Sequence, residues 1–131
     1  MGPQRDVITG PGVPRPIGPY SPGVRVGDLL FVSGQPGVDP ETAQPIGPTF
    51  GEQARQAFLN LEAVLRAGGS SPDLVASITV LVADVAAFAE LNEVFAEVFP
   101  SAPPTRMTMQ VPLPLGLLIS VGCIAAVGPS A

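Results

Sequence analysis

The sequence predicts an α+β fold in which one mixed β-sheet carries two helices on the same face. Two segments place apolar residues at helical spacing, and shorter segments around them are rich in β-branched or alternating apolar residues, in the order β, β, α, β, α, β, β. Right-handed crossovers between such strands put both helices on one side of the sheet. The chain of 131 residues suffices for one such domain, and we assign residues 1–131 to it.

The N-terminal segment is interrupted by glycine and proline, so we expect an ordered lead-in loop over roughly the first twenty residues. Apolar runs at 24–26 and 29–32 then flank Gly27 and Asp28, which predicts a tight β-hairpin. The sequence Ser-Gly-Gln-Pro at 33–36 predicts the end of the second strand.

A first helix is predicted to begin after a capping box. Thr49 is followed three residues later by Glu52, and these side chains can satisfy each other's backbone N–H groups. Apolar residues then form one face: Ala54, Ala57, Phe58, Leu61, Val64 and Leu65. Gly68 and Gly69 are expected to end this helix.

The second half of the chain predicts one helix between strands. Residues 75–82 are rich in β-branched residues and predict a strand, and Asp84 is expected to cap a helix that ends before Pro100. Its expected apolar face is Phe88, Leu91, Phe95, Val98 and Phe99. Strands are predicted at 107–111 and 117–127, and the second is apolar on both sides. Because no helix covers the far face of the sheet, we expect a partner subunit there.

The composition excludes several kinds of chemistry. The chain has no His, no Lys and no Trp, and Cys123 is its one cysteine. A Schiff base to a protein amine, an imidazole base, a Cys-rich zinc site and an internal disulfide are therefore excluded. We expect no metal and no cofactor. Cys123 has no basic neighbour in sequence to lower its pKa, so we interpret it as a small core residue.

The charge pattern argues against nucleic-acid and membrane partners. The formal net charge is −5, the isoelectric point is near 4.4, and the six Arg residues are scattered. Residues 1–10 lack the apolar core of a signal peptide, and the apolar stretch 111–127 is interrupted by proline and glycine. We therefore expect a cytoplasmic protein.

Four groups of residues, taken in order, resemble the Rid family of reactive-intermediate deaminases, of the RidA or YjgF type. These groups are Ile17–Ser21, Gly27–Gln35, Leu91–Phe95 with Phe99–Pro100, and Pro104–Thr108. The resemblance implies a chorismate-mutase-like fold with a six-stranded mixed sheet, and a homotrimer whose intersubunit clefts bind small carboxylates. It also implies cofactor-free hydrolysis of enamines and imines, such as 2-aminoacrylate, to 2-keto acids and ammonia.

Arg106 corresponds in this resemblance to the arginine that binds the substrate carboxylate. A planar guanidinium donates two parallel hydrogen bonds to a carboxylate and stays charged when it is partly buried. The structural alternative is a salt bridge between subunits, because an Arg in an apolar strand needs an acidic partner.

The resemblance also assigns pocket positions to Tyr20, Asn92, Thr108 and the backbone at Ser33 and Gly34. Each has a structural alternative. Tyr20 would be a packed aromatic residue with its hydroxyl satisfied, and Asn92 would tie a helix to a loop. Ser33 and Gly34 would belong to an ordinary turn.

The last predicted strand departs from the family pattern. Ser120 and Gly122 stand where many deaminases of the family carry two glutamates, one of which is thought to orient the attacking water. Leu115 stands where a lysine is common. We therefore expect Ser120, Thr108 or backbone carbonyls to position the water.

Two main hypotheses follow. The first is an imine or enamine hydrolase in which Arg106 and Ser120 are the catalytic residues. The second is a small-carboxylate binding protein, or a pathway-specific enzyme acting on a larger imine over an apolar floor at Leu115 and Leu117. A ribonuclease, an old name attached to the family, fits poorly with an acidic chain that lacks His and Lys.

Overall fold

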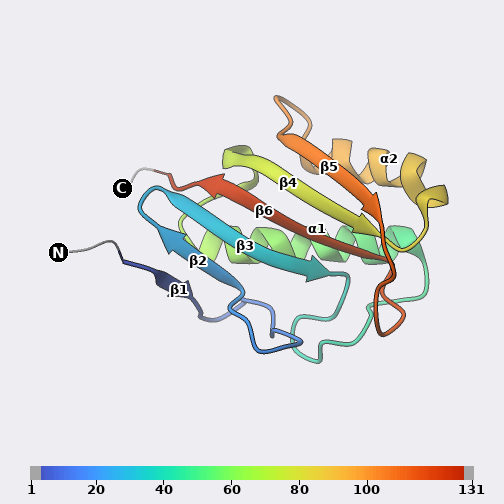
Figure 1. The fold of residues 1–131 in the computed structure, drawn as a ribbon, viewed down its shortest axis with the longest axis horizontal. Helices are drawn as coiled ribbons and strands as arrows, with labels where there is room; N and C mark the ends of the chain where they lie inside the picture. The colour runs from blue at the N-terminus through green and yellow to red at the C-terminus, as the bar shows by residue number, and fades with distance from the viewer. Residues whose placement is uncertain (1–3, 129–131) are drawn as a thin grey trace.

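The computed structural model describes residues 4–128, which form an α+β fold with a six-stranded sheet (Figure 1). Its strands are β1 (Asp6–Ile8), β2 (Gly23–Val26), β3 (Leu29–Pro36), β4 (Val75–Val82), β5 (Thr105–Gln110) and β6 (Ile119–Ala126). Its helices are α1 (Phe50–Ala67) and α2 (Phe88–Val98), with short 3-10 turns η1 (Pro72–Leu74) and η2 (Val85–Ala87).

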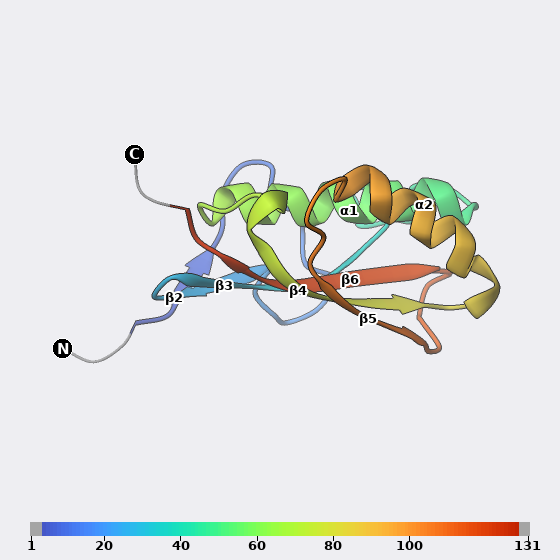
Figure 2. The ribbon, with the colours of Figure 1, turned by 90° about the horizontal axis from the view of Figure 1, so that it is seen from above.

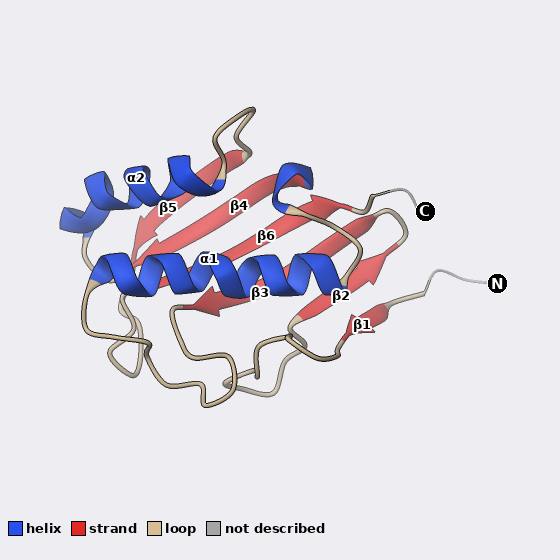
Figure 3. Cartoon of the chain, turned by 180° about the vertical axis from the view of Figure 1, so that it is seen from behind, coloured by secondary structure: helices blue, strands red, loops and turns tan. Residues whose placement is uncertain are grey.

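The predicted mixed sheet is confirmed. Its strand order is β1-β2-β3-β6-β4-β5, and neighbours are antiparallel except for the parallel pair β4 and β5. Both helices lie on one face, as seen from above in Figure 2 and from behind in Figure 3. Strand β5 is an edge strand, and α2 connects it to β4.

The prediction of a loop throughout the N-terminal segment was wrong. Residues Asp6–Ile8 form β1, which pairs with β2 in the register Val7 to Val24. Three residues are too few to show an alternating pattern, and the strand forms because a distant partner satisfies its backbone groups.

The predicted end of the second strand was also wrong. Strand β3 continues to Pro36, and its pairing with β6 shifts between Val32 and Gln35 before it resumes. The Ser33–Gly34 segment is therefore an irregularity inside a strand and does not form a turn. Strand β6 starts at Ile119 and ends at Ala126, inside the predicted range 117–127.

Helix α1 begins and ends as predicted. The Thr49 hydroxyl accepts a hydrogen bond from the Glu52 backbone N–H, and the Glu52 carboxylate accepts one from the Thr49 N–H. Gly68 follows the last helical residue, and Gly69 adopts the left-handed φ of 84° that favours glycine.

The predicted cap of the second helix was wrong in detail. Asp84 accepts a hydrogen bond from Ala86 N, so it caps the 3-10 turn η2. Helix α2 begins at Phe88 without a side-chain cap. Phe88 is 41% exposed, whereas Leu91 and Phe95 are buried. An aromatic residue in the first turn is thus free to contact something other than the core.

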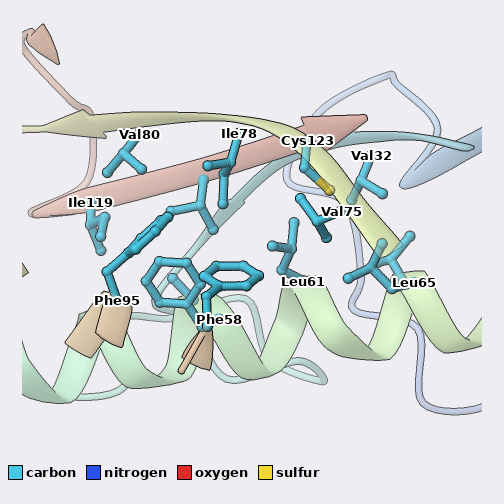
Figure 4. Packing of buried hydrophobic residues seen from close by; sticks show 14 of the residues in the cluster. Val32, Phe58, Leu61, Leu65, Val75, Ile78, Val80, Phe95, Ile119 and Cys123 are labelled. Carbon is cyan, nitrogen blue, oxygen red and sulfur yellow. The ribbon is translucent and has the colours of Figure 1, made fainter. Parts of the chain in front are cut away.

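The core lies between the sheet and the helices. Phe58, Leu61 and Leu65 of α1 point toward sheet residues that include Ile78 and Cys123 (Figure 4). On the opposite face, several large apolar side chains are more than a third exposed: Phe31, Met107, Met109 and Ile124. None of the helices that the structure describes is long and apolar enough to cross a membrane.

Candidate functional site

A pocket of about 370 Å³ opens where β3 ends and β6 begins. It contains four of the predicted site residues, namely Tyr20, Ser33, Gly34 and Ser120. Its other lining residues are Ile17, Pro36, Leu113, Pro114 and Leu117. Leu117 was predicted as part of an apolar floor, but the prediction of Leu115 for the same floor was wrong, because Leu115 is 71% exposed and does not line this pocket. The prolines and the glycine at 112–116 indicate a loop there. The contact of this loop with β3 is a tertiary contact, which the local sequence does not predict.

Tyr20 is 41% exposed and belongs to a tight turn at the pocket. Its hydroxyl oxygen accepts a hydrogen bond from Ile17 N at 3.2 Å, and its backbone N–H bonds to Gly18 O. Within the part of the chain described, the hydroxyl proton has no acceptor. Tyr20 is therefore held in place and still has a donor to offer.

Ser33 and Gly34 contribute differently to the pocket. The Ser33 hydroxyl donates to Ser21 O at 2.6 Å, which anchors the Tyr20 turn to β3. A Cβ atom added at Gly34 would lie 2.7 Å from Ser120 Oγ, so the absence of a side chain at Gly34 leaves room for Ser120. The Ser120 hydroxyl therefore lies in the pocket next to the backbone of Gly34, with no side chain between them.

Arg106 lies elsewhere, between β5 and α2. Its Nη2 donates to Asn92 Oδ1 at 2.9 Å. Its guanidinium carbon lies 4.8 Å from the ring centre of Phe95 and 5.3 Å from that of Phe88, which are cation–π distances. The sequence did not predict this stacking, although Phe88 and Phe95 are spaced to share a helix face. The half-buried guanidinium is thus fixed by an amide and two rings.

Residues 4–128 of one chain contain no acidic partner for Arg106, so the salt bridge that is the structural alternative would have to come from another subunit. Ion pairs within these residues join Arg55 to Glu97 and Arg66 to Glu62. Asn92 occupies one N–H of the five that a guanidinium offers. Within one chain, the positive charge of Arg106 therefore remains available to an anionic ligand or to a carboxylate of a neighbouring subunit.

Thr108 follows Arg106 on the same side of β5. Its hydroxyl oxygen is buried and has no hydrogen-bond partner among the residues described. A buried hydroxyl without a partner loses about 1–3 kcal/mol of solvation. A ligand or a neighbouring protein atom at this position would restore that bond.

Within one chain, the predicted site residues form two groups on opposite faces of the sheet. Arg106 is in register with Ile78, which is buried under the helices, so it lies on the helix side. Ser120 is in register with Leu81 and alternates with buried residues of β6, so it lies on the helix-free side. One chain does not bring Arg106, Asn92 and Thr108 into the Ser120 pocket.

Cys123 lies in the core and is 6% exposed. Burial raises the pKa of the Cys123 thiol to about 12. Its interpretation as a core residue is confirmed by its place in the hydrophobic cluster. No group of three or more His, Cys, Asp or Glu residues in positions 4–128 is placed to hold a metal ion.

The fold and these two groups define a small α+β protein with an uncharged pocket and a separate, half-buried arginine that has no acidic partner among residues 4–128. Residues 12–127 match the family model described as Endoribonuclease L-PSP. The chain belongs to this family, which is also called the Rid, YjgF or RutC family.

Individual relatives cover nearly the whole chain. A RutC family protein of Saccharolobus solfataricus is 42% identical over 92% of this chain and 97% of its own length. The 2-iminobutanoate/2-iminopropanoate deaminase of Mus musculus is 38% identical over 95% of this chain and 93% of its own. The crystal structure of RidA from a Psychrobacter species is 36% identical, with a TM-score of 0.89 over 93% of this chain and 99% of that one.

Proposed function

We propose that the protein hydrolyses reactive enamines and imines of the 2-aminoacrylate type to 2-keto acids and ammonia. The observation that carries the proposal is Arg106, a half-buried guanidinium fixed by Asn92 and two aromatic rings, with no carboxylate partner in residues 4–128. A charge held in this way favours a carboxylate ligand. Homologues at 38% and 35% identity are named as an imine deaminase and a reactive intermediate deaminase.

The proposed site is completed by a second copy of the chain, within a cytoplasmic homotrimer. The pocket contains no ionised group, and Arg106 lies on the other face of the sheet, on the edge strand β5. Met107 and Phe31 leave apolar surface on the helix-free face, which a neighbouring subunit would cover. An intersubunit cleft would place the Arg106 of one chain beside the Ser120 pocket of another.

In this cleft, Arg106 binds the substrate carboxylate, and Thr108 donates its free hydroxyl to the same group. The enamine gains a proton on carbon and loses one from nitrogen, and so becomes the imine. Water then adds to the C=N carbon and gives one proton to nitrogen. The resulting carbinolamine transfers its hydroxyl proton to the amine and expels ammonia, which leaves the 2-keto acid. Ser120 or backbone carbonyls orient the water, and Tyr20 donates a hydrogen bond from its free hydroxyl. Positioning of this kind accelerates a reaction that also proceeds in water.

A coupled assay with freshly generated 2-aminoacrylate tests the proposal. Arg106→Ala should lose most of the activity of the wild type, because the carboxylate loses its charged partner. Arg66→Ala is the matched control, since it removes an exposed Arg that pairs with Glu62. No activity in the wild type would overturn the proposed reaction. Equal activity in wild type and Arg106→Ala would overturn the role of Arg106.

A second candidate is a small-carboxylate binding protein, or an enzyme for a larger imine. The observation that favours it is the pocket, where apolar Leu113 and Leu117 accompany Ser120, and no carboxylate is present to orient water. Calorimetry with pyruvate and with a bulkier 2-keto acid separates these cases, because a binding protein retains affinity without turnover. A ribonuclease is not proposed, since the net charge of −5 opposes phosphate binding.

A further inference from the structure

We propose that Gln53 and Asn60, two buried side-chain amides of α1, are positioning residues that set the width of the Ser120 pocket by holding its two walls. The inference rests on the proposed function, because it concerns which imines the pocket accepts. Gln53 is 1% exposed and Asn60 is 2% exposed, and both side chains bond to backbone outside the helix. Neither residue lines the pocket itself.

Gln53 holds the wall formed by residues 113–118. Its Nε2 donates to Gly47 O at 3.0 Å and to Gly116 O at 3.3 Å, and its Oε1 accepts from Leu118 N at 2.8 Å. Both N–H donors of the amide and one of the two lone pairs of its oxygen are thus used, and two of the three bonds go to this wall.

The wall needs such a restraint because its backbone is strained. Leu115 has a φ of 60° and Gly116 a φ of 73°, so two consecutive residues adopt the left-handed region. The Leu115 side chain is 71% exposed and contributes little packing of its own. Gln53 fixes the segment from the helix side, and this places Leu117 at the pocket.

Asn60 holds the opposite wall at the end of β3. Its Nδ2 donates to Pro36 O at 3.0 Å and to Val38 O at 2.9 Å, and its Oδ1 accepts from Gln56 Nε2. Pro36 lines the pocket. Between these two carbonyls the chain runs so close to α1 that a Cβ atom at Gly37 would overlap the Gln53 backbone.

The two amides act from one rigid element. Gln53 and Asn60 are seven positions apart in the sequence, which places them on the same helix face about 10 Å apart along the axis. A single helix, α1, therefore fixes the positions of both pocket walls and with them the distance between the walls. Apolar side chains of the same volume would fill the space equally well but would not direct these carbonyls and N–H groups.

The first measurement is acrylamide quenching of tyrosine fluorescence. The chain has one Tyr and no Trp, so the emission reports on Tyr20, which lines the pocket. Gln53→Met and Asn60→Leu should raise the quenching constant. Ser70→Ala is the matched control, because it removes a buried hydrogen bond to Ala126 O, at the far end of β6. If Gln53→Met does not fold, the isosteric Gln53→Glu removes the two donors instead.

The second measurement is the ratio of kcat/KM for a small and a bulky 2-imino acid. A pocket of fixed width discriminates between side chains that differ by a few methylene groups by about tenfold or more, and the amide variants should lose most of that ratio. Greater quenching and a lower ratio in the amide variants, with neither in Ser70→Ala, would support the proposal.

Lower thermal stability with unchanged quenching would overturn the proposal, because the amides would then be purely structural. Equal quenching changes in Ser70→Ala would overturn it too. An unchanged ratio in the amide variants would show that they do not set specificity. If the wild type hydrolyses no imine, the proposed function fails, and the Tyr20 measurement still decides whether Gln53 and Asn60 hold the pocket.

Discussion

Arg106 and Asn92 are joined by a hydrogen bond of 2.9 Å that runs from the guanidinium Nη2 to the amide Oδ1. The bond connects edge strand β5 to helix α2 and orients the guanidinium over Phe88 and Phe95. An amide orients the charge without neutralising it, which a carboxylate would do. We therefore expect the residue at position 92 to determine how strongly Arg106 attracts an anion.

The first prediction is that Asn92→Asp weakens binding of pyruvate or 2-oxobutanoate by about tenfold or more, although the two side chains have the same shape. The new carboxylate competes with the ligand for Arg106, in a site where charge pairs are worth about 2 kcal/mol or more. Isothermal titration calorimetry measures the change. Asn92→Ser is the control, since it removes the amide but adds no charge. Equal affinity in Asn92→Asp and the wild type would show that the carboxylate binds away from Arg106.

The second prediction concerns the contact between Gly34 and Ser120. Gly34→Ala places a Cβ atom 2.7 Å from Ser120 Oγ and should displace that hydroxyl. We expect ligand affinity and turnover to fall, and Ser120→Ala in the same chain to restore the fold stability lost in Gly34→Ala. A double-mutant cycle measured by urea unfolding should give a coupling of about 0.5–3 kcal/mol. Additive effects of the two substitutions would contradict this contact.

The third prediction is that native Cys123 resists alkylation. Burial raises the pKa of the Cys123 thiol to about 12, so at pH 8 only about one molecule in ten thousand carries the thiolate. Iodoacetamide should label the unfolded chain at least about a thousandfold faster than the folded one. Labelling at the same rate in both states would mean that the thiol is accessible and ionisable.

The same raised pKa of Cys123 predicts a loss of stability at high pH. Between the ordinary pKa of 9.0 and the folded value of about 12, the unfolded chain releases a proton that the folded chain keeps. The free energy of unfolding should thus fall as the pH rises through 9. Cys123→Ala should lack this part of the decrease.

Local signals in the sequence were strong enough to predict α1 and β4. The capping box at Thr49 and the two glycines after Ala67 act within a few residues of their own position. Strand β1 and the continuation of β3 to Pro36 depend on partners far along the chain, and their own residues carry no periodic pattern. Asp84 was assigned to the wrong element because a 3-10 turn and an α-helix accept the same cap.

For the candidate site, too, some features could be predicted from the sequence and others depend on long-range contacts. The candidate residues come from the resemblance, but a motif does not state which face of the sheet a side chain occupies. The face follows from the strand register. Arg106 pairs with Ile78, whose side chain is on the helix side of the sheet, and Ser120 pairs with Leu81, whose side chain is on the helix-free side. The stacking of Phe88 on Arg106 requires the crossover through α2 to be in place, and so it was not predictable from spacing.

The fourth prediction is trimeric assembly through the helix-free face. Light scattering at micromolar concentration should give the mass of three chains, and Met107→Asp should reduce it. Met107 is 61% exposed on that face. Leu59→Asp is the matched control, because Leu59 is 60% exposed but lies on α1. A folded monomeric wild type, or equal effects of the two substitutions, would contradict the intersubunit cleft.

The last prediction concerns Ser120 and the orientation of the attacking water. A hydroxyl does not change charge near pH 4 to 8, so wild-type turnover of 2-aminoacrylate should be slow and should vary little with pH in that range. Ser120→Glu should raise turnover by about a hundredfold, the lower end of what a positioned base contributes. The longer side chain has room, since Ser120 lines the pocket of about 370 Å³.

The pH dependence of turnover shows whether the new glutamate in Ser120→Glu acts as a base or only occupies space in the pocket. In the uncharged pocket, desolvation should raise the pKa of the new glutamate, so the gain should develop as the pH rises through that pKa and the carboxylate forms. Ser120→Gln has nearly the same shape and no titrating group, and it should show neither the gain nor the pH dependence. Equal rates in the Glu and Gln variants, or a wild type that is already faster than Ser120→Glu, would mean that the water is oriented by other groups. The first candidates would then be the Thr108 hydroxyl and the backbone carbonyls at the pocket wall.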